Sequence, residues 1–273
     1  MSLLTNYHES LGFKESPFTL TPDTSLFFPN PDHVAALSHM QYGLETSSFT
    51  LITGEVGVGK TLLCRELLKN APENIHTAYI FNPLQSRQDL LQSILLDLTG
   101  ENRELDSVTA LHDAIYQALL KIAENNGKTA IIIDEVHCLT PDILEALRLI
   151  SNLETEKQKL ISFILVGQPE IKKLLKLDSL RALSQRICVN YNITAMTPKA
   201  TSEYIQHRIK HCQTETSFDV SYMARFWIHQ YAKGIPRRVN QICDRAILAA
   251  YAKNTTCVTA KMAIKAAKEV ISI

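Results

Sequence analysis

Gly54-Glu55-Val56-Gly57-Val58-Gly59-Lys60-Thr61 is the segment from which the fold of this 273-residue chain follows. It matches G-x-x-x-x-G-K-[ST] in full and holds three of the chain's nine glycines. Glycine permits positive φ and close backbone approach, so successive N–H groups can form a cradle for phosphate at a helix N-terminus. In this pattern Lys60 reaches the β- and γ-phosphates and the Thr61 hydroxyl binds Mg²⁺, which predicts a site for ATP.

The flanks of this loop have the character that the motif requires. Phe49–Thr53 is an apolar, β-branched run typical of a buried strand, and Thr61–Lys69 has leucines at helical spacing. We therefore expect a strand, a tight loop and a helix in succession. The nucleotide-binding residues expected from the motif are Gly54, Glu55, Val56, Gly57, Val58, Gly59, Lys60, Thr61 and Leu62.

A second apolar strand, Thr129–Ile133, ends in the acidic pair Asp134 and Glu135. Asp134 is placed to hold Mg²⁺, directly or through water, and Glu135 is placed to act as general base for the attacking water. Such a pair is common at strand ends, and it gains weight only in combination with the phosphate loop. His137 follows, and we interpret it as a structural or capping histidine.

The pattern of apolar residues predicts an α/β core. The composition, 45% hydrophobic and 21% charged, excludes a disordered or collagen-like chain. Apolar strands alternate with amphipathic helices, which indicates a parallel sheet with helices on both faces. We expect strands near Phe49–Thr53, Thr77–Phe81, Thr129–Ile133, Ile161–Val166 and Ile187–Tyr191, and helices near His33–Glu45, Thr61–Lys69, Arg87–Leu98, Ser107–Glu124, Pro141–Leu153 and Glu170–Lys176.

After Tyr191 the alternation ends and the sequence is helical throughout. Thr197, Asp219 and Thr259 are cap signals at the start of three of the four expected helices. We therefore predict two domains, a nucleotide-binding core at residues 1–195 and a small all-helical lid at residues 196–273. The four helices expected in the lid are Thr197–Cys212, Asp219–Lys233, Arg237–Lys253 and Thr259–Ile271.

The two predicted domains carry opposite net charges although the whole chain is neutral. With 28 Lys and Arg against 28 Asp and Glu, no overall field favours nucleic acid or a membrane surface. Residues 196–273 hold 12 basic and 5 acidic side chains, net +7, and residues 1–195 are net −7. The basic lid suits either an anionic ligand or contact with the acidic core, within one subunit or between subunits.

Three features of the sequence indicate in which cellular compartment the protein lies. The longest apolar runs, such as Ile161–Gly167, fall short of the ~20 residues that span a bilayer. The first residues lack a basic region and an apolar segment, so we expect no signal peptide. The six cysteines are scattered without a Cys-x-x-Cys pair, which favours buried thiols in a reducing cytoplasm over a metal or disulfide framework.

A phosphate-loop core followed by a helical lid resembles the AAA+ ATPases, and further segments resemble the ExeA (general secretion pathway protein A) family. The similarity covers nearly the whole chain, and within the family the chain most resembles the short members that accompany MSHA-type type IV pilus assembly. Longer members continue into a membrane span and a periplasmic peptidoglycan-binding domain. Because this chain resembles the short members and stops before either segment, we do not expect peptidoglycan binding. The segments that carry the resemblance are Gly12–Phe18, Thr21–Asp23, Phe27-Phe28, His33–Leu37, Leu165–Glu170, Leu180–Ile187 and Gly234–Asn240.

The resemblance implies roles for further residues in the chemistry. Gln168, after the fourth strand, matches the sensor-1 position that helps to hold the attacking water. Asn82, after the second strand, matches a residue that can hold Glu135 inactive until a partner binds. Arg237 matches the sensor-2 arginine of the lid, which touches the γ-phosphate.

The resemblance also implies a site shared between subunits. Arg186 matches the arginine finger that reaches into a neighbouring subunit, and Arg181 is the alternative. Pro17 and Phe18 either border the adenine or form an ordinary hydrophobic plug, and we favour the plug.

The function we predict is hydrolysis of Mg-ATP that drives subunit rearrangement in a head-to-tail homo-oligomer, a ring or a filament. The expected setting is assembly of a pilus or secretion machine, with the protein in the cytoplasm and attached to the inner membrane only through partner proteins. One alternative is a DNA-associated regulator of the transposition type, which the basic lid keeps open. The other is a scaffold that uses ATP as a slow switch, against which Glu135 and Arg186 argue.

Overall fold

The computed structural model describes residues 3–46, 48–81, 86–101, 105, 107–154, 159–214 and 217–271. The chain divides into two compact units, which we call the sheet unit (residues 32–55 and 63–193) and the helical unit (residues 1–31, 56–62 and 194–273). This division differs from the predicted domains, because the N-terminal 31 residues and part of the phosphate loop group with the C-terminal helices.

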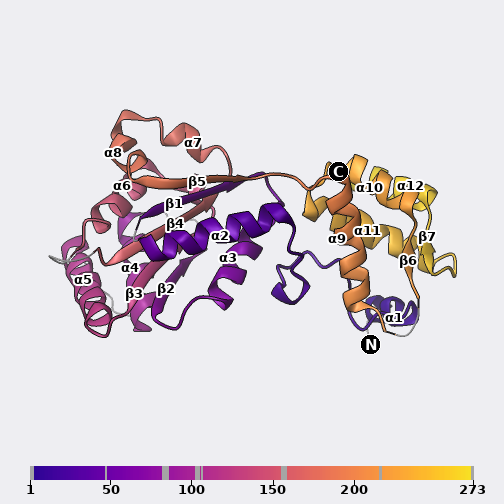
Figure 1. The fold of residues 1–273 in the computed structure, drawn as a ribbon, viewed down its shortest axis with the longest axis horizontal. Helices are drawn as coiled ribbons and strands as arrows, with labels where there is room; N and C mark the ends of the chain where they lie inside the picture. The colour runs from indigo at the N-terminus through magenta and orange to yellow at the C-terminus, as the bar shows by residue number, and fades with distance from the viewer. Residues whose placement is uncertain are drawn as a thin grey trace. The chain divides into compact units, whose positions relative to one another are not determined.

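The sheet unit is built on a parallel sheet, as the alternation of strands and helices predicts (Figure 1). In the described part of the chain its five strands lie in the order β2-β3-β4-β1-β5. All four neighbouring pairs are parallel, so the carboxyl ends of the strands meet at one edge of the sheet. The strands are β1 (Phe49–Gly54), β2 (Ile75–Ile80), β3 (Lys128–Ile133), β4 (Ile161–Gly167) and β5 (Ile187–Ile193).

Both faces of the inner strands β1, β3 and β4 are buried, which explains why these strands read as continuous apolar runs, whereas the edge strands β2 and β5 are partly exposed. On one face Leu51, Ile131 and Phe163 lie in a buried cluster with residues of α4, α5 and α6. On the other face α2 packs closely, because a Cβ added at Gly43 would lie 2.2 Å from Thr50 Oγ1. The helices are α2 (Pro31–Thr46), α3 (Lys60–Lys69), α4 (Arg87–Thr99), α5 (Val108–Glu124), α6 (Pro141–Ile150), α7 (Ile171–Leu174) and α8 (Arg181–Ser184).

The helical unit corrects two details of the predicted lid. Helix α10 begins after Ser221, whose hydroxyl accepts a hydrogen bond from the Ala224 amide at 3.3 Å, so Asp219 is not its cap. Asp219 instead lies in a two-residue strand, β6, which pairs in parallel with β7 and joins the helices. The elements are α1 (Leu3–Ser10), α9 (Pro198–Cys212), β6 (Asp219–Val220), α10 (Tyr222–Ala232), α11 (Pro236–Tyr251), β7 (Cys257–Val258) and α12 (Ala260–Ile271).

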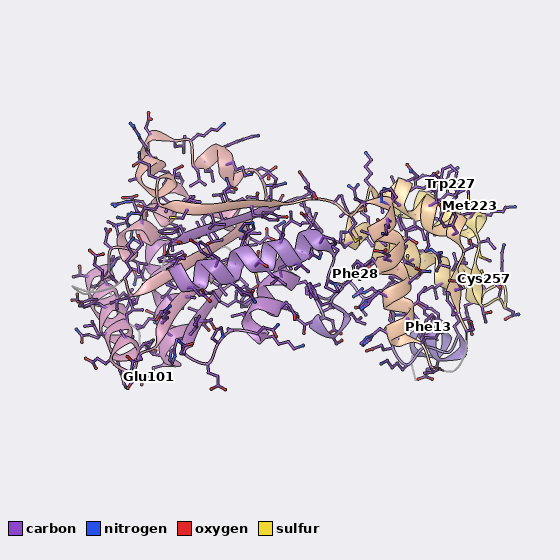
Figure 2. All side chains as sticks on the ribbon, viewed as in Figure 1. Phe13, Phe28, Glu101, Met223, Trp227 and Cys257 are labelled. Carbon is purple, nitrogen blue, oxygen red and sulfur yellow. The ribbon has the colours of Figure 1, made fainter. Side chains whose placement is uncertain are left out.

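The N-terminal segment belongs to this unit because its aromatic residues complete the apolar core of the C-terminal helices. Phe13 is 1% exposed, and its ring lies 5.1 Å from that of Phe218. Phe28 packs edge-on against Tyr204 of α9 at 5.8 Å (Figure 2). Phe18 is 2% exposed in the same cluster, which accords with the hydrophobic plug.

None of the helices in the described ranges combines the length and the apolar character needed to cross a bilayer.

Candidate functional site

The phosphate loop has the conformation that its glycines make possible. Strand β1 ends at Gly54 and α3 begins at Lys60, so the motif lies between a strand and a helix as the sequence predicts. Gly57 has φ +83° and Gly59 has φ +104°, both in the left-handed region that residues with a side chain rarely adopt. The loop therefore turns tightly and delivers backbone N–H groups to the start of α3, where an anion binds best.

Helix α11 approaches this loop within the helical unit. The amide of Arg237 donates a hydrogen bond to the carbonyl oxygen of Gly57 at 3.2 Å. A Cβ added at Gly57 would lie 2.7 Å from Cβ of Arg237, so glycine is required here for space as well as for its positive φ. Pro236 at the first position of α11 sets the helix start just before Arg237. The residue predicted as sensor-2 thus contacts the phosphate loop through its backbone.

Asp134 lies at the carboxyl end of β3 and is held from several sides. It is 4% exposed, and its amide donates to the carbonyl of Ile80 at 2.9 Å. One carboxylate oxygen accepts from the Glu135 amide at 2.8 Å, and the other accepts from the Tyr79 hydroxyl at 3.3 Å. Burial raises the pKa of Tyr79 well above its usual value, and the nearby Asp134 carboxylate adds to the rise, so this hydroxyl remains a donor.

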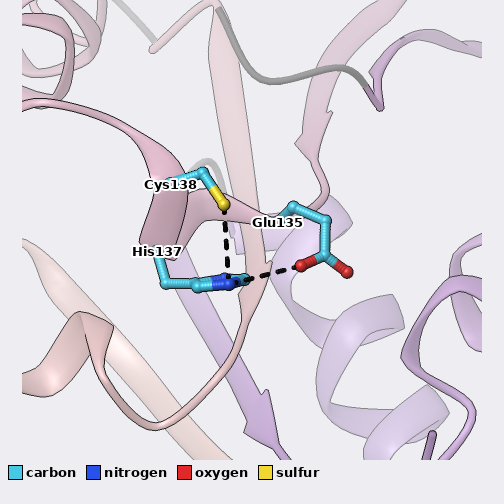
Figure 3. A group of neighbouring side chains, drawn as sticks. All are labelled: Glu135, His137 and Cys138. Atoms are coloured by element: carbon cyan, nitrogen blue, oxygen red, sulfur yellow. Dashed lines mark hydrogen bonds and ion pairs between the residues drawn. The ribbon is translucent and has the colours of Figure 1, made fainter. Parts of the chain in front are cut away.

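Glu135, His137 and Gln168 form one hydrogen-bonded group at the ends of β3 and β4. Figure 3 shows the contact between His137 and Glu135. His137 Nε2 lies 3.4 Å from Glu135 Oε2 and 2.7 Å from the side-chain amide of Gln168. The backbone N–H of Gln168 donates to His137 Nδ1 at 3.3 Å. The structure therefore brings together the predicted base and the predicted sensor-1 residue, with His137 between them.

The same region holds a group of metal-binding side chains, Glu135, His137 and Cys138, whose ligand atoms lie within 4.8 Å of one another. Cys138 Sγ is 3.5 Å from His137 Nε2 (Figure 3). Because Nδ1 of the ring accepts the Gln168 amide, the proton of a neutral His137 is on Nε2. A protonated Nε2 has no lone pair for a metal, so this arrangement is a hydrogen-bond network in its present form.

Arg186 lies at the opposite edge of the sheet. It immediately precedes β5, and Ile187 pairs with Phe49 at the start of β1. Its guanidinium donates to the carbonyl of Arg148 at 3.2 Å, to Asn152 Oδ1 at 2.5 Å and to the Ser151 hydroxyl. These acceptors lie at the C-terminus of α6, which a cation stabilises.

The surroundings of Arg186 leave both arginine assignments open. It lines a pocket of about 230 Å³ at the amino edge of the sheet, together with Lys159, Gln185 and Cys188. Arg181, the alternative finger, is exposed at the start of α8.

Two residues that contact the candidate catalytic groups were not predicted to do so. Tyr79 carries no motif, and only the placement of β2 beside β3 reveals it. The sequence favours a structural or capping histidine at position 137. Its contact with Gln168 arises only because the β3–β4 pairing brings these distant residues together. Asn82, which the resemblance placed beside Glu135, lies outside the described residues.

Comparison with known proteins identifies relatives of the chain. A family described as an AAA domain matches residues 43–175. General secretion pathway protein A of Aeromonas hydrophila is 34% identical over 250 residues, which are 91% of this chain and 46% of that protein. The chain thus spans about half the length of this curated relative.

Solved structures share the fold at low sequence identity. The ORC1 protein of Aeropyrum pernix in complex with DNA has a TM-score of 0.70 and 18% identity, over 95% of this chain and 70% of that chain. Cdc6p from Pyrobaculum aerophilum has a TM-score of 0.67 and 20% identity, over 91% of this chain and 71% of that one. The RuvB Holliday junction branch migration motor of Thermotoga maritima has a TM-score of 0.57 and 20% identity, over 88% and 67%.

These likenesses establish the fold as that of a P-loop NTPase, a parallel α/β core followed by a small helical domain. The AAA-domain match and the 34% identity that runs along 91% of the sequence show that the chain is related to the ExeA (general secretion pathway protein A) family of AAA+ ATPases.

Proposed function

We propose that the chain binds Mg-ATP and hydrolyses it at the carboxyl edge of its sheet. The observation that carries the proposal is the strand order, which makes β3, β4 and β1 neighbours. The phosphate loop therefore leaves the sheet beside the strands that end in Asp134 and Gln168. A crevice outside the carboxyl ends of parallel strands is where open α/β sheets bind their ligands.

The residues present fit ATP and Mg²⁺. Gly57 and Gly59 have the positive φ that a phosphate cradle requires, and Lys60 begins the helix that follows. Thr61 and Asp134 offer the hydroxyl and carboxylate oxygens that Mg²⁺ prefers. Bound Mg²⁺ would neutralise charge that develops on the β- and γ-phosphates. Glu55, Val56, Val58 and Leu62 complete the run that surrounds the phosphates in this proposal.

In this proposal the chemical step falls to residues at the carboxyl ends of β3 and β4. Glu135 acts as general base and takes the proton of the attacking water, while Gln168 orients that water for in-line attack. Arg237 responds to the γ-phosphate, and the hydrogen bond from its amide to Gly57 supports this role. Phosphate occupancy is thereby transmitted to α11.

The active site is completed by a second subunit in this proposal. Arg186 lies at the amino edge of the sheet, so it cannot serve the ATP at the carboxyl edge of its own chain. A head-to-tail assembly brings the amino edge of one copy to the carboxyl edge of the next and closes into a ring or extends as a filament. An arginine supplied in this way contributes ~10³–10⁵ to kcat.

The cellular role proposed is ATP-driven assembly of a secretion machine or an MSHA-type type IV pilus. The name of the Aeromonas hydrophila relative, general secretion pathway protein A, supports this direction. In this setting the protein is cytoplasmic and joins the inner membrane through partner proteins.

A second candidate is action on DNA, favoured by the net charge of +7 on residues 196–273. Measurement of phosphate release with and without duplex DNA separates the two roles. Turnover that rises several-fold with DNA at low salt would support the second candidate. A chain that binds ATP but releases no phosphate under any condition would support the slow switch instead.

The partner is best found with a protein arrested before hydrolysis. We expect Glu135→Gln to hold ATP and to retain its partners when it is recovered from the native host with Mg-ATP. Lys60→Ala is the matched control, because it should not reach the ATP-bound state. Inner-membrane assembly proteins enriched on the first variant and absent from the second would support the pilus or secretion role, and equal recovery would contradict an ATP-dependent interaction.

A further inference from the structure

We infer that His137 is a positioning residue that joins Glu135 and Gln168 into one catalytic unit. The inference rests on the proposed hydrolysis, because it assigns how the base and the water-orienting residue of that site are held. His137 itself does not touch the phosphates or the water. Its role is to fix the direction of two side chains that come from different strands.

The protonation of the His137 ring follows from its contacts. Nδ1 lies 3.3 Å from the backbone N–H of Gln168, which can only donate. Nδ1 must therefore accept, and the proton of the neutral ring is on Nε2. The backbone of β4 thus selects one tautomer of a histidine that follows β3.

The Nε2–H group then faces Glu135, Gln168 and the more distant Cys138, whose Sγ lies 3.5 Å away. Glu135 Oε2 lies 3.4 Å from Nε2, and the side-chain amide of Gln168 lies 2.7 Å from it. The structure sets the amide nitrogen of Gln168 toward Nε2, so both ring nitrogens would face N–H donors. Because the nitrogen and oxygen of a glutamine amide are assigned from the hydrogen-bond network, we turn this amide over so that Gln168 Oε1 accepts from the ring. One proton is therefore shared between the carboxylate and the amide, and the other end of that amide is left to orient water.

Packing fixes the ring that makes these bonds. The side chain of His137 is 12% exposed, whereas that of Glu135 is 38% exposed. The end of β4 packs closely against His137. A Cβ added at Gly167 would lie 3.3 Å from His137 Nδ1 and 3.2 Å from its backbone nitrogen. An immobile ring that bonds a more exposed carboxylate restrains it, since Glu135 would otherwise sample several rotamers.

The test uses two amide substitutions that differ in where they place an N–H. In His137→Gln the amide nitrogen is as far from Cβ as Nε2 is, so the donor to Glu135 is kept. In His137→Asn the nitrogen is as far from Cβ as Nδ1 is, so that donor is lost. We expect His137→Gln to stay within ~3-fold of wild-type kcat and His137→Asn to lose ~10-fold or more, less than loss of the base itself.

Three measurements separate positioning from a merely structural role. The affinity for ATP and the melting temperature should be the same for both variants, because neither touches the phosphate loop. Gln168→Ala combined with His137→Asn should cost little more than either alone, since the two act through one group. Equal kcat for the Gln and Asn variants, or fully additive losses, would overturn the inference.

The ring tautomer gives a readout that does not depend on hydrolysis. Histidine-selective nitrogen NMR of the wild-type protein should show a resonance protonated at Nε2 and unprotonated at Nδ1 that disappears in His137→Asn. A ring protonated at Nδ1 would contradict the inference even if the chain hydrolyses ATP. Absence of any turnover in the wild-type protein would instead count against the proposed function, and the NMR result would still decide the tautomer.

Discussion

At the carboxyl edge of the sheet, polar side chains from neighbouring strands bond to one another, whereas at the amino edge Arg186 bonds to the end of a helix in its own chain. Asp134 is buried and held by two donors, and Glu135 is linked to Gln168 through His137. Arg186 makes three hydrogen bonds around the C-terminus of α6. The carboxyl edge therefore has side chains that already contact one another, as in a reaction site. At the amino edge the Arg186 guanidinium is bound by acceptors of its own chain.

Under the proposed mechanism, one chain contains the parts of a site but holds them at opposite edges of its sheet. Transition-state charge on the transferred phosphoryl group needs a cation opposite the base. Under the proposed mechanism this cation comes from the amino edge of another copy, which must exchange three internal hydrogen bonds for contact with phosphate. Hydrolysis is then controlled by assembly.

The largest effect is expected when the phosphate loop loses Lys60. Lys60→Ala should abolish binding of ATP, because Lys60 is the lysine of the phosphate cradle. Titration with a fluorescent ATP analogue measures the loss, and an unchanged melting temperature would show that the fold is intact. Wild-type affinity in this variant would contradict the assignment of the loop.

Removal of the cation at the amino edge of the sheet is next. Arg186→Ala should bind ATP and lose ~10³-fold or more in kcat, as arginine fingers do. Loss of its hydrogen bonds to α6 should also lower the free energy of unfolding by ~1 kcal/mol. Arg181→Ala is the matched control, and a larger loss of kcat in that variant would move the finger to Arg181.

Glu135→Gln separates binding from chemistry at the carboxyl edge. It should retain ATP affinity and lose ~10²-fold or more in kcat, because an amide cannot accept the proton of water. Single-turnover measurements with saturating enzyme would isolate the chemical step. Turnover at the wild-type rate would show that another group acts as base.

The smallest effect concerns the partly buried histidines of the helical unit. Burial lowers the pKa of His8, His207 and His229 in the helical unit from 6.5. The unfolded chain therefore binds protons that the folded unit does not, so stability present above about pH 6.5 falls as the pH drops below it. Burial also lowers the pKa of His112 in the sheet unit, so that unit is expected to respond to pH in the same direction. Trp227 in α10 is the chain's one tryptophan, so its fluorescence reports unfolding of the helical unit.

Denaturation followed by this fluorescence at about pH 7.5 and about pH 5.5 tests the expectation, with a lower midpoint at the acidic pH. Replacement of His229 by Gln should weaken the dependence. A midpoint that rises on acidification would show that other groups dominate.

The phosphate loop and the acidic strand end could be predicted from neighbouring residues alone. Strand, glycine loop and helix are adjacent in the chain, so the order β1, loop, α3 follows from residues 49–69 alone. Asp134 and Glu135 were identified because a buried strand immediately precedes them. The phosphate loop and the acidic pair can therefore each be predicted from the residues that immediately surround them.

Contacts between segments that are far apart in the sequence could not be predicted from it. Asp219 and Ser221 are both good cap residues, and Ser221 takes the role because residues 219–220 pair with β7. The role of His137 depends on the backbone of Gln168. Neither pairing leaves a periodic signal in the sequence, because each depends on how separate elements meet.

The measurement that tests the shared site most directly is activity in a mixture of two inactive variants. Glu135→Gln has a dead site and an intact Arg186, and Arg186→Ala has the reverse. In an equal mixture about a quarter of head-to-tail interfaces pair an intact base with an intact arginine, so turnover should return to about a quarter of the wild-type value per subunit. Mixtures no more active than the separate variants, with wild-type activity per subunit that does not change on dilution, would contradict a site completed by a second copy.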